Sequence, residues 1–376
     1  MGRQPPRERT TLTITALAVV YPPVFSGPHN TTMIAAKLLE AQDVQTIIVV
    51  PDDPNAQPGI DRMRAAGCEV IPMPLHRTRV LKDPRVHWEY LRSLRPEVRA
   101  LADLIRDRKV DVVANNMVNN IQRALAARKA DVACVWELID TASPQLVRTV
   151  YSPLVRRLSD VVMTTGVKVA EVHPGVTELG DRWITYFPCV DVERFRPSAD
   201  VRKQVRAELA IPDDALVIGN VAAMSEMKGH RWFISAAAKI RAEFPNTRFV
   251  ILGSRHADRG PYYESLWAQA ESLGLHVGTD LIVQDPGSRV HELAQAFDVF
   301  WLTSEPKSEG IPTAIGEAKA LQIPVVTTDV GSCSECVTPG ESGFVVPPQD
   351  ADAIAGATRP LLQDADLRRR FGVRGR

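Results

Sequence analysis

The sequence lacks the features that mark several classes of protein. Its cysteines number five in 376 residues. So few, and an odd count, argue against a disulfide framework and favour a reducing compartment, so we expect a cytoplasmic protein. Lys+Arg and Asp+Glu are both 45, which leaves no excess positive charge to hold a nucleic acid, and we expect none as a partner. No apolar run reaches the length of about 18 residues that a membrane-spanning helix needs.

The N-terminus carries a basic segment followed by an apolar one. Arg3, Arg7 and Arg9 precede the apolar run 12–20. This order resembles a secretory signal, but Tyr21-Pro22-Pro23 follows directly and no small-residue cleavage site closes the run. A basic tail that leads into a buried first strand is therefore the favoured interpretation.

The composition that is present is typical of a globular protein, with 45% hydrophobic and 24% charged residues. Short runs rich in Val and Ile alternate with helical patterns such as 32–39 and 96–108, the second of which opens on a proline. The strands that we predict in the first half are largely apolar, as in a parallel sheet covered on both faces. They are 11–20, 46–50, 69–72, 110–114, 132–136 and 161–165.

The same alternation restarts after a turn-rich segment, which we predict to be a hinge at 186–200. An amphipathic helix is indicated by Phe233, Ala237, Ile240 and Phe244. The sequence thus predicts two doubly wound α/β domains, 1–190 and 191–376, whose ligands bind at the carboxyl ends of the strands. The strands that we predict in the second half are 215–221, 248–252, 280–283, 299–302 and 325–328.

Two strand-to-helix corners could contact an anion. The first contains Gly27, where a ligand could approach the backbone, and then His29, Asn30 and Thr31. Either Asn30 or Thr31 could cap the following helix, and a plain cap and turn is an equal alternative to a phosphate or acceptor contact. At the second corner, Lys228-Gly229-His230 offers a lysine that could reach a diphosphate, although a solvated corner is the commoner role.

A third segment follows the apolar run 299–302 and carries two carboxylates. Glu309 lies in a predicted loop, and Glu317 comes eight residues later on a predicted helix. Gly310 and Ile311 offer backbone N–H groups near the start of that helix, where an anion would be stabilised. The alternative is that these residues only cap the helix and add surface charge.

Taken in order along the chain, these segments resemble the retaining GT-B glycosyltransferases of glycosyltransferase family 4, the group 1 type. The resemblance covers nearly the whole chain and is strongest from Val190 to Val346. The matching motifs are Val190-Asp191-Val192-Glu193-Arg194-Phe195, Lys228-Gly229-His230, Glu309-x7-Glu317, Gly331-x-x-x-Glu335 and Gly343-Phe344-Val345-Val346-Pro347-Pro348. It implies two Rossmann-like domains that face a central cleft, with a nucleotide-diphospho-sugar donor held mainly by the second.

The resemblance also implies roles for individual residues. Lys228 would neutralise the diphosphate and Glu309 would hydrogen-bond the transferred sugar, both acting in catalysis, while Glu317 would bind the ribose. The remaining donor contacts implied are Gly27, Val283, Gly310, Ile311, Pro312 and Thr313. Fixed positive groups and N–H dipoles aimed at the departing diphosphate stabilise the transition state without a metal, so we expect no metal and no other cofactor.

The sequence departs from the family at three places. Ala223 stands where the family usually has an arginine, and Arg255 after the next strand is a possible substitute, if it is not merely exposed. No histidine follows the fifth strand; Glu137 or Asp140 could bind the acceptor instead, alongside His29 and Asn30, although an N-cap is the favoured role for Asp140. Family members also continue with a helix that crosses back to the first domain, whereas this sequence ends at Arg376, so we expect a looser hinge.

Two further patterns have competing interpretations. Cys333 and Cys336 have CxxC spacing, but no second pair completes a zinc site, so packed thiols are favoured over redox chemistry. Arg148, Arg156 and Arg157 form a basic amphipathic stretch that could touch anionic lipid, although three cations favour a solvated helix face. We therefore expect at most peripheral membrane contact.

The function predicted is a metal-independent retaining transfer of a hexose or N-acetylhexosamine from a nucleotide sugar to a hydroxyl of a small hydrophilic or saccharide acceptor. A UDP-sugar is the favoured donor, and a GDP-sugar is possible. One alternative is a non-catalytic GT-B protein that binds a nucleotide sugar or a partner. A GT-B sugar-nucleotide epimerase is another, but it would need a set of acid and base residues that the sequence does not offer.

Overall fold

We analysed a computed structural model, which describes residues 13–21, 25, 27–76, 84–254, 260–306 and 308–376. The chain forms two compact units. The first comprises the described residues up to Leu138 together with Pro144–Thr164 and His173–Ile184. The second comprises Thr185–Arg376 and two short segments, Ile139–Ser143 and Thr165–Val172.

The first unit contains a seven-stranded sheet in the order β3-β2-β1-β4-β5-β6-β7. Neighbouring strands from β3 to β6 pair in parallel, as the apolar runs predicted. Its strands are β1 (Ile14–Val19), β2 (Val44–Pro51), β3 (Glu69–Met73), β4 (Val112–Asn116), β5 (Ala133–Leu138), β6 (Val161–Thr164) and β7 (Trp183–Thr185).

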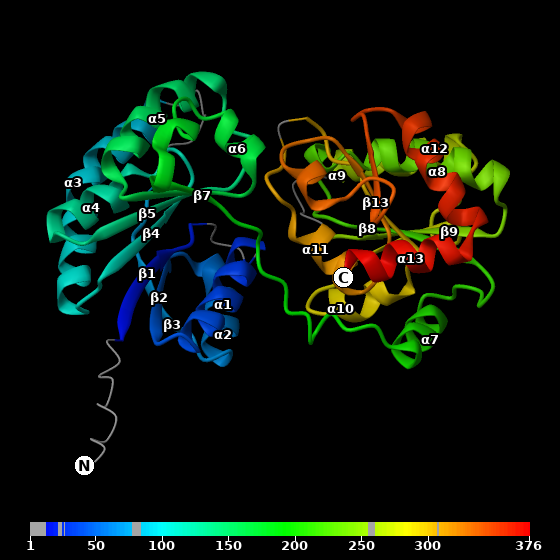
Figure 1. Cartoon of the computed structure of the whole chain (residues 1–376), viewed down its shortest axis with the longest axis horizontal. Helices are drawn as coiled ribbons and strands as arrows, with labels where there is room; N and C mark the ends of the chain where they lie inside the picture. Colours follow the sequence, from blue (N-terminus) through cyan, green and yellow to red (C-terminus); the bar gives the residue numbers. More distant parts are fainter. Residues whose placement is uncertain (1–12, 22–24, 26, 77–83, 255–259, 307) are drawn as a thin grey trace, which may run out of the picture. The chain divides into compact units, whose positions relative to one another are not determined.

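Helices cover both faces of this sheet. Figure 1 shows α1 and α2 together on one side and α3, α4 and α5 on the other. The bounds of these helices are α1 (Gly27–Glu40), α2 (Gln57–Ala65), α3 (Pro84–Asp107), α4 (Ile121–Ala130) and α5 (Gln145–Leu158).

The second unit contains a six-stranded parallel sheet in the order β10-β9-β8-β11-β12-β13. Its strands are β8 (Leu216–Val221), β9 (Thr247–Leu252), β10 (Leu281–Gln284), β11 (Val299–Leu302), β12 (Val325–Thr328) and β13 (Gly343–Val346). Its helices are α6 (Val167–Glu171), α7 (Ala199–Glu208), α8 (His230–Glu243), α9 (Gly260–Ser272), α10 (Val290–Leu293), α11 (Thr313–Ala320), α12 (Ala351–Gln363) and α13 (Ala365–Gly375).

The core of the second unit lies on both faces of its sheet, and β11 shows why. Phe300 and Leu302 belong to one buried cluster, whereas Val299 and Trp301 belong to the other. Successive side chains of a strand point to opposite faces, so a strand buried on both faces must be apolar throughout. The indole N–H of Trp301 donates to the Thr358 hydroxyl at 2.8 Å, which satisfies the polar atom of this buried ring.

Several predicted boundaries differ from the structure. Pro96 does not open a helix, because α3 runs through it from Pro84 to Asp107. Pro96 lies on the exposed side of α3, where solvent can bind the carbonyl oxygen that the missing N–H leaves without a helix partner. α1 begins at Gly27, so Asn30 and Thr31 lie inside the helix and not at its N-cap position. The short strands β7 and β13 were not predicted as strands.

No helix among the described residues is both long enough and apolar enough to cross a bilayer.

Candidate functional site

The centre of the candidate site is the carboxylate of Glu309, in the loop between β11 and α11. Two donors converge on its Oε1 atom: Lys228 Nζ at 2.5 Å and Ser304 Oγ at 2.6 Å. Glu309 is buried, and the Lys228 side chain is about a quarter exposed (26%). A buried carboxylate needs such partners, because an unpaired charge in the interior is costly. The structure therefore brings together two residues that are 81 positions apart and that the sequence had singled out separately.

Two glycines of the matched motifs permit this geometry. Gly229 has φ +63°, and a Cβ there would lie 1.9 Å from the Thr303 carbonyl oxygen. Gly331 has φ +50°, and a Cβ there would lie 2.1 Å from the carbonyl oxygen of Glu309. Other residues rarely adopt these angles, and neither position has room for a side chain. Both glycines thus let the backbone pack closely around the Glu309 loop.

Ser304 was not assigned a role from the sequence. It is fully buried, two residues after the end of β11, and its carbonyl oxygen accepts a hydrogen bond from the Thr328 hydroxyl at 2.9 Å. This links the ends of the neighbouring strands β11 and β12 to Glu309. A polar residue close to the end of a buried strand was the available signal, since ligands of parallel sheets bind at that edge.

Glu317 lies on α11, two turns after the Glu309 loop. Burial raises the pKa of Glu317 to about 7, and the nearby Arg194 guanidinium offsets part of that effect. Arg194 is tied to the loop after β10 by a bond from Nη2 to the Ser288 carbonyl oxygen at 2.7 Å. Arg194 therefore has an electrostatic role here that its place in the family motif did not reveal.

The remaining predicted donor residues are placed as follows. Pro312 is the N-cap of α11 and Thr313 is its first residue, so Gly310 and Ile311 directly precede the helix. Val283 packs its side chain against the core of the second unit. Ala223 is exposed after β8. Gly27 is the exposed first residue of α1 in the first unit, and Arg255 lies outside the described residues.

The predicted acceptor residues belong to two different parts of the chain. Burial raises the pKa of Glu137, at the end of β5, to about 7. His29 is buried on α1 and stacks on Phe25 with ring centroids 5.4 Å apart. Asp140 does not cap α5, whose N-cap is Pro144; its Oδ1 accepts from the Ala142 N–H at 2.9 Å. Asn30 is partly buried on α1.

The first unit also contains a buried polar cluster that sequence reasoning missed. Arg123 on α4 is 2% exposed, and Glu97 and Tyr90 on α3 act on its charge. Burial lowers the pKa of Arg123 to about 10 and raises that of Glu97. Arg123 Nη1, Glu97 Oε1, Tyr90 Oη and Asn115 Oδ1 are buried without a hydrogen-bond partner. The residues of this cluster come from different helices and strands, so no local sequence motif predicts it.

The two cysteines with CxxC spacing are buried, and both thiols are free. Burial raises the pKa of Cys336 to about 12 and that of Cys333 well above its usual value. Thiols so far from ionisation are poor nucleophiles, which agrees with the prediction of packed thiols. Among the described residues, no three or more His, Cys, Asp or Glu side chains are grouped to hold a metal ion.

Comparison with known proteins gives consistent matches. Residues 201–376 match the family model described as "Glycosyl transferases group 1". The chain is 30% identical over 232 residues to a D-inositol 3-phosphate glycosyltransferase of Corynebacterium urealyticum, which is 61% of this chain and 54% of that protein. It is 32% identical over 198 residues to a GDP-mannose-dependent alpha-(1-6)-phosphatidylinositol monomannoside mannosyltransferase of Mycolicibacterium smegmatis, covering 50% of this chain and 49% of that protein. The chain thus spans about half the length of these curated relatives.

Solved structures share the fold over nearly the whole chain. A glycosyltransferase from Rickettsia africae superposes with a TM-score of 0.79 at 18% identity, covering 96% of this chain and 92% of that one. HepE of Anabaena, solved in complex with UDP and glucose, superposes with a TM-score of 0.78 at 18% identity. The match covers 96% of this chain and 93% of HepE.

Proposed function

Because residues 201–376 match the family model described as "Glycosyl transferases group 1", we propose that this chain transfers a hexose or N-acetylhexosamine from a nucleotide-diphospho-sugar to a hydroxyl group of a small polyhydroxylated acceptor. The observation that carries the proposal is the buried Glu309 carboxylate, held by Lys228 and Ser304 beside the start of α11.

In this proposal Lys228 stabilises the leaving diphosphate and Glu309 orients the sugar. Breaking the bond between sugar and phosphate develops negative charge on the diphosphate, and a fixed cation lowers the energy of that state. The contact between Lys228 Nζ and Glu309 Oε1 places this cation directly beside the carboxylate. We assign Glu309 Oε2 to a hydroxyl of the transferred sugar, because Oε1 already accepts from two protein donors.

The nucleoside and phosphate contacts follow from α11. We assign the ribose hydroxyls to Glu317, and the phosphate oxygens to backbone N–H groups of Gly310 and Ile311. Pro312 and Thr313 support this assignment because they begin α11 just after those amides, where the helix dipole favours an anion. Val283, Gly27 and Arg255 remain further proposed donor contacts. Arg255 is a proposed replacement for the cation missing at Ala223.

A UDP-sugar is the proposed donor, and a GDP-sugar is the second candidate. HepE, of the same fold, has been solved with UDP and glucose, whereas the Mycolicibacterium relative is named as GDP-mannose-dependent. The identity of the base is therefore the first thing that the experiment below determines.

We propose acceptor contacts through Glu137, His29 and Asn30 of the first unit and through Asp140, which belongs to the second. A carboxylate with a pKa near 7 both accepts and, when protonated, donates a hydrogen bond, which suits a hydroxyl group. Two curated relatives have an inositol or phosphatidylinositol acceptor in their names, so a cyclitol is the first acceptor to try.

Three finer features complete the proposal. We propose that transfer retains the anomeric configuration, that it needs no metal, and that the protein works in the cytoplasm. The free thiols of the described cysteines suit a reducing compartment. Activity that persists in EDTA would support metal independence, and strict dependence on a divalent cation would contradict it.

The test begins with thermal unfolding of the full chain in the presence of UDP, GDP, ADP, TDP and their sugars. A ligand at 100 times its Kd adds about 2.7 kcal/mol of apparent stability, which is easily measured. A shift with one nucleotide, followed by release of that nucleotide when donor and a cyclitol are mixed, would support the proposal. Binding without release in an acceptor screen would instead favour a non-catalytic protein that binds a nucleotide sugar, the reading that Ala223 supports.

A further inference from the structure

The outward side of α5 is an apolar stripe with positive charge. Leu146, Val150 and Leu154 are 75%, 56% and 37% exposed, and their spacing of four residues places them along one side of the helix. Arg157 continues the same side and is exposed, whereas Val155 on the opposite side is buried. α5 contains no aspartate or glutamate. The charged side chains of α5 are therefore all cationic.

The outward side of α3 also combines apolar residues with cations, and it ends in the exposed acid Asp103, which pairs with Arg106. Trp88 and Leu91 are 68% and 61% exposed. Arg92, Arg95 and Arg99 continue that side of the helix and are exposed. Tyr90, Glu97 and Leu101 point the opposite way and are buried. Glu89 is rotated from Trp88 by about 100° around the helix axis, so it lies beside this side of α3 and not within it.

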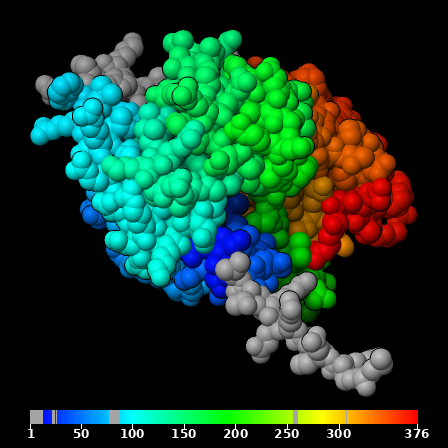
Figure 2. Space-filling view, turned by 60° about the vertical axis from the view of Figure 1, so that its left-hand side comes forward, coloured from blue at the N-terminus to red at the C-terminus, as the bar shows by residue number. Residues whose placement is uncertain are grey.

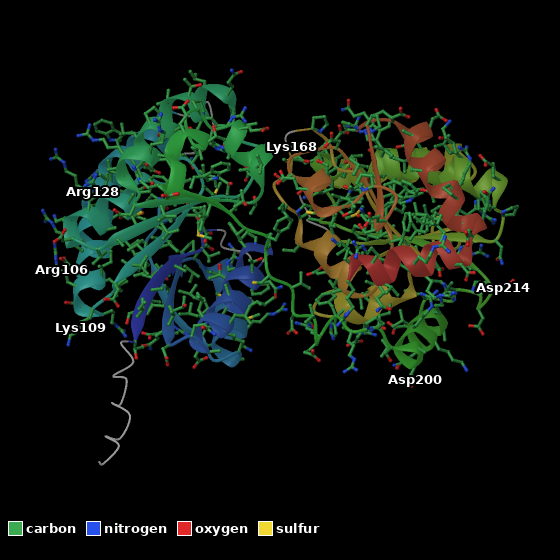
Figure 3. The ribbon with its side chains drawn as sticks, in the orientation of Figure 1. Arg106, Lys109, Arg128, Lys168, Asp200 and Asp214 are labelled. Atoms are coloured by element: carbon green, nitrogen blue, oxygen red, sulfur yellow. The ribbon has the colours of Figure 1, made fainter. Side chains whose placement is uncertain are left out.

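The two helices belong to one layer on the same side of the sheet. Burial raises the pKa of Tyr90 on α3, and the nearby Tyr151 of α5 raises it further. Arg106 of α3 donates to the Lys129 carbonyl oxygen at 2.6 Å, and Arg128 of α4 donates to the Arg157 carbonyl oxygen at 2.7 Å. Figure 3 labels both arginines. These bonds tie the C-terminal ends of α3, α4 and α5 together. In Figure 2 the surface formed by this layer, coloured cyan to green, faces the viewer.

Single exposed apolar residues are common, but a group of them on helices of one layer marks an interaction surface. We define the α3/α5 face as Trp88, Leu91, Leu146, Val150 and Leu154 with Arg92, Arg95, Arg99 and Arg157. Its chemistry selects the partner. A tryptophan, aliphatic side chains and arginines fit the boundary between lipid headgroups and acyl chains, where the apolar groups insert and the cations meet phosphate.

We propose that the α3/α5 face docks the protein reversibly on a bilayer surface that contains anionic lipid. The proposal does not depend on glycosyl transfer, because every residue in it lies outside the donor and acceptor contacts proposed above. If both proposals hold, the acceptor is one that is carried at a membrane surface.

The experiment measures binding of the full chain to vesicles by co-sedimentation. Vesicles of phosphatidylcholine alone are compared with vesicles that also contain phosphatidylglycerol, at low and at high salt. We expect binding to the anionic vesicles that weakens as salt rises. The double variant Leu146→Ser/Val150→Ser should bind at least about tenfold more weakly, because it removes the inserted groups. Arg92→Gln/Arg95→Gln should reduce both the binding and its dependence on salt.

A matched control is Leu38→Ser on α1, where the leucine is 57% exposed but lies outside the α3/α5 face. It should bind like the original protein, and all variants should unfold at the same temperature. The fluorescence of Trp88, isolated as the difference from a Trp88→Phe variant, should shift to the blue on anionic vesicles. Absence of binding to anionic vesicles, or equal loss with Leu38→Ser, would overturn the proposal. Concentration-dependent dimers that Leu146→Ser/Val150→Ser abolishes, without vesicle binding, would assign the face to a second copy of the chain instead.

Discussion

The Ser304 hydroxyl donates to the same oxygen of Glu309 that Lys228 contacts, at 2.6 Å against 2.5 Å for the lysine. The serine is completely buried, whereas the lysine is partly open to solvent. Ser304 is therefore the fixed partner that sets the orientation of the carboxylate, and Lys228 is the partner that a ligand can reach.

This arrangement predicts that Ser304→Ala slows turnover without abolishing donor binding. A hydrogen bond to a charged group contributes roughly 1.5–3 kcal/mol, which corresponds to about a 10- to 100-fold lower kcat. The measurement is kcat from nucleotide release together with the donor Kd from calorimetry. Ser308→Ala is the matched control, because Ser308 is also buried nearby but donates to the Glu305 carbonyl oxygen. Equal effects of the two variants would remove the positioning role.

Lys228→Ala should lower turnover by about 10²-fold or more if the lysine stabilises the departing diphosphate. Lys239→Ala serves as the control, since Lys239 lies on α8 in an exposed pair with Asp352 and has no place in the site. Initial rates at saturating donor separate loss of chemistry from loss of binding. Near-normal rates in Lys228→Ala would exclude the lysine from the reaction.

Nucleotide affinity should depend on pH through Glu317. Burial raises its pKa to about 7, so the side chain is neutral below that pH and a carboxylate above it. The carboxylate can accept a ribose hydroxyl on each oxygen, whereas the acid carries a proton on one of them, so affinity should rise between pH 6 and pH 8, about one unit on either side of that value. The phosphates of the nucleotide titrate as well, and Glu317→Gln measured over the same pH series isolates the contribution of the residue. Identical pH profiles would contradict the ribose role.

Glu97→Ala should destabilise the first unit by about 3–5 kcal/mol, because it removes the carboxylate whose charge acts on buried Arg123 and whose Oε2 accepts from the His76 N–H at 2.9 Å. Tyr90→Phe should be neutral or slightly stabilising, since the Tyr90 hydroxyl is buried without a partner. Glu69→Ala removes the exposed pair with Arg108 and should cost no more than about 1 kcal/mol. Urea unfolding of the three variants gives the comparison. A small loss of unfolding free energy in Glu97→Ala would mean that solvent already stabilises the charge of Arg123.

The strands were the most predictable part of the fold. β11 and β12 have the predicted bounds, Val299–Leu302 and Val325–Thr328, because a strand buried on both faces is a continuous apolar run. Pro96 misled the prediction of α3, since a proline is compatible with a helix start and, on a solvent-facing side, with a helix interior.

The order and spacing of the motifs along the chain were enough to identify the residues of the candidate site. The contacts between those residues could not be predicted in this way. Lys228 and Glu309 each follow a strand, which identifies the edge of the sheet but not a 2.5 Å ion pair. Arg123 and Glu97 lie on separate helices and meet only through packing. Such a cluster has no signature in a single sequence. The apolar stripe of α5 is visible as a spacing of four residues in the sequence, but only the structure shows that this side of the helix is exposed.

The pairing of Lys228 with Glu309 has a consequence for how a donor arrives. The ion pair has no net charge, and the chain as a whole carries a formal charge of zero. A diphosphate in solution therefore meets little attractive field before contact, so its association rate should be that of an unsteered encounter and should change little with ionic strength. Selectivity among anions would then arise after the encounter, in how fast each one leaves.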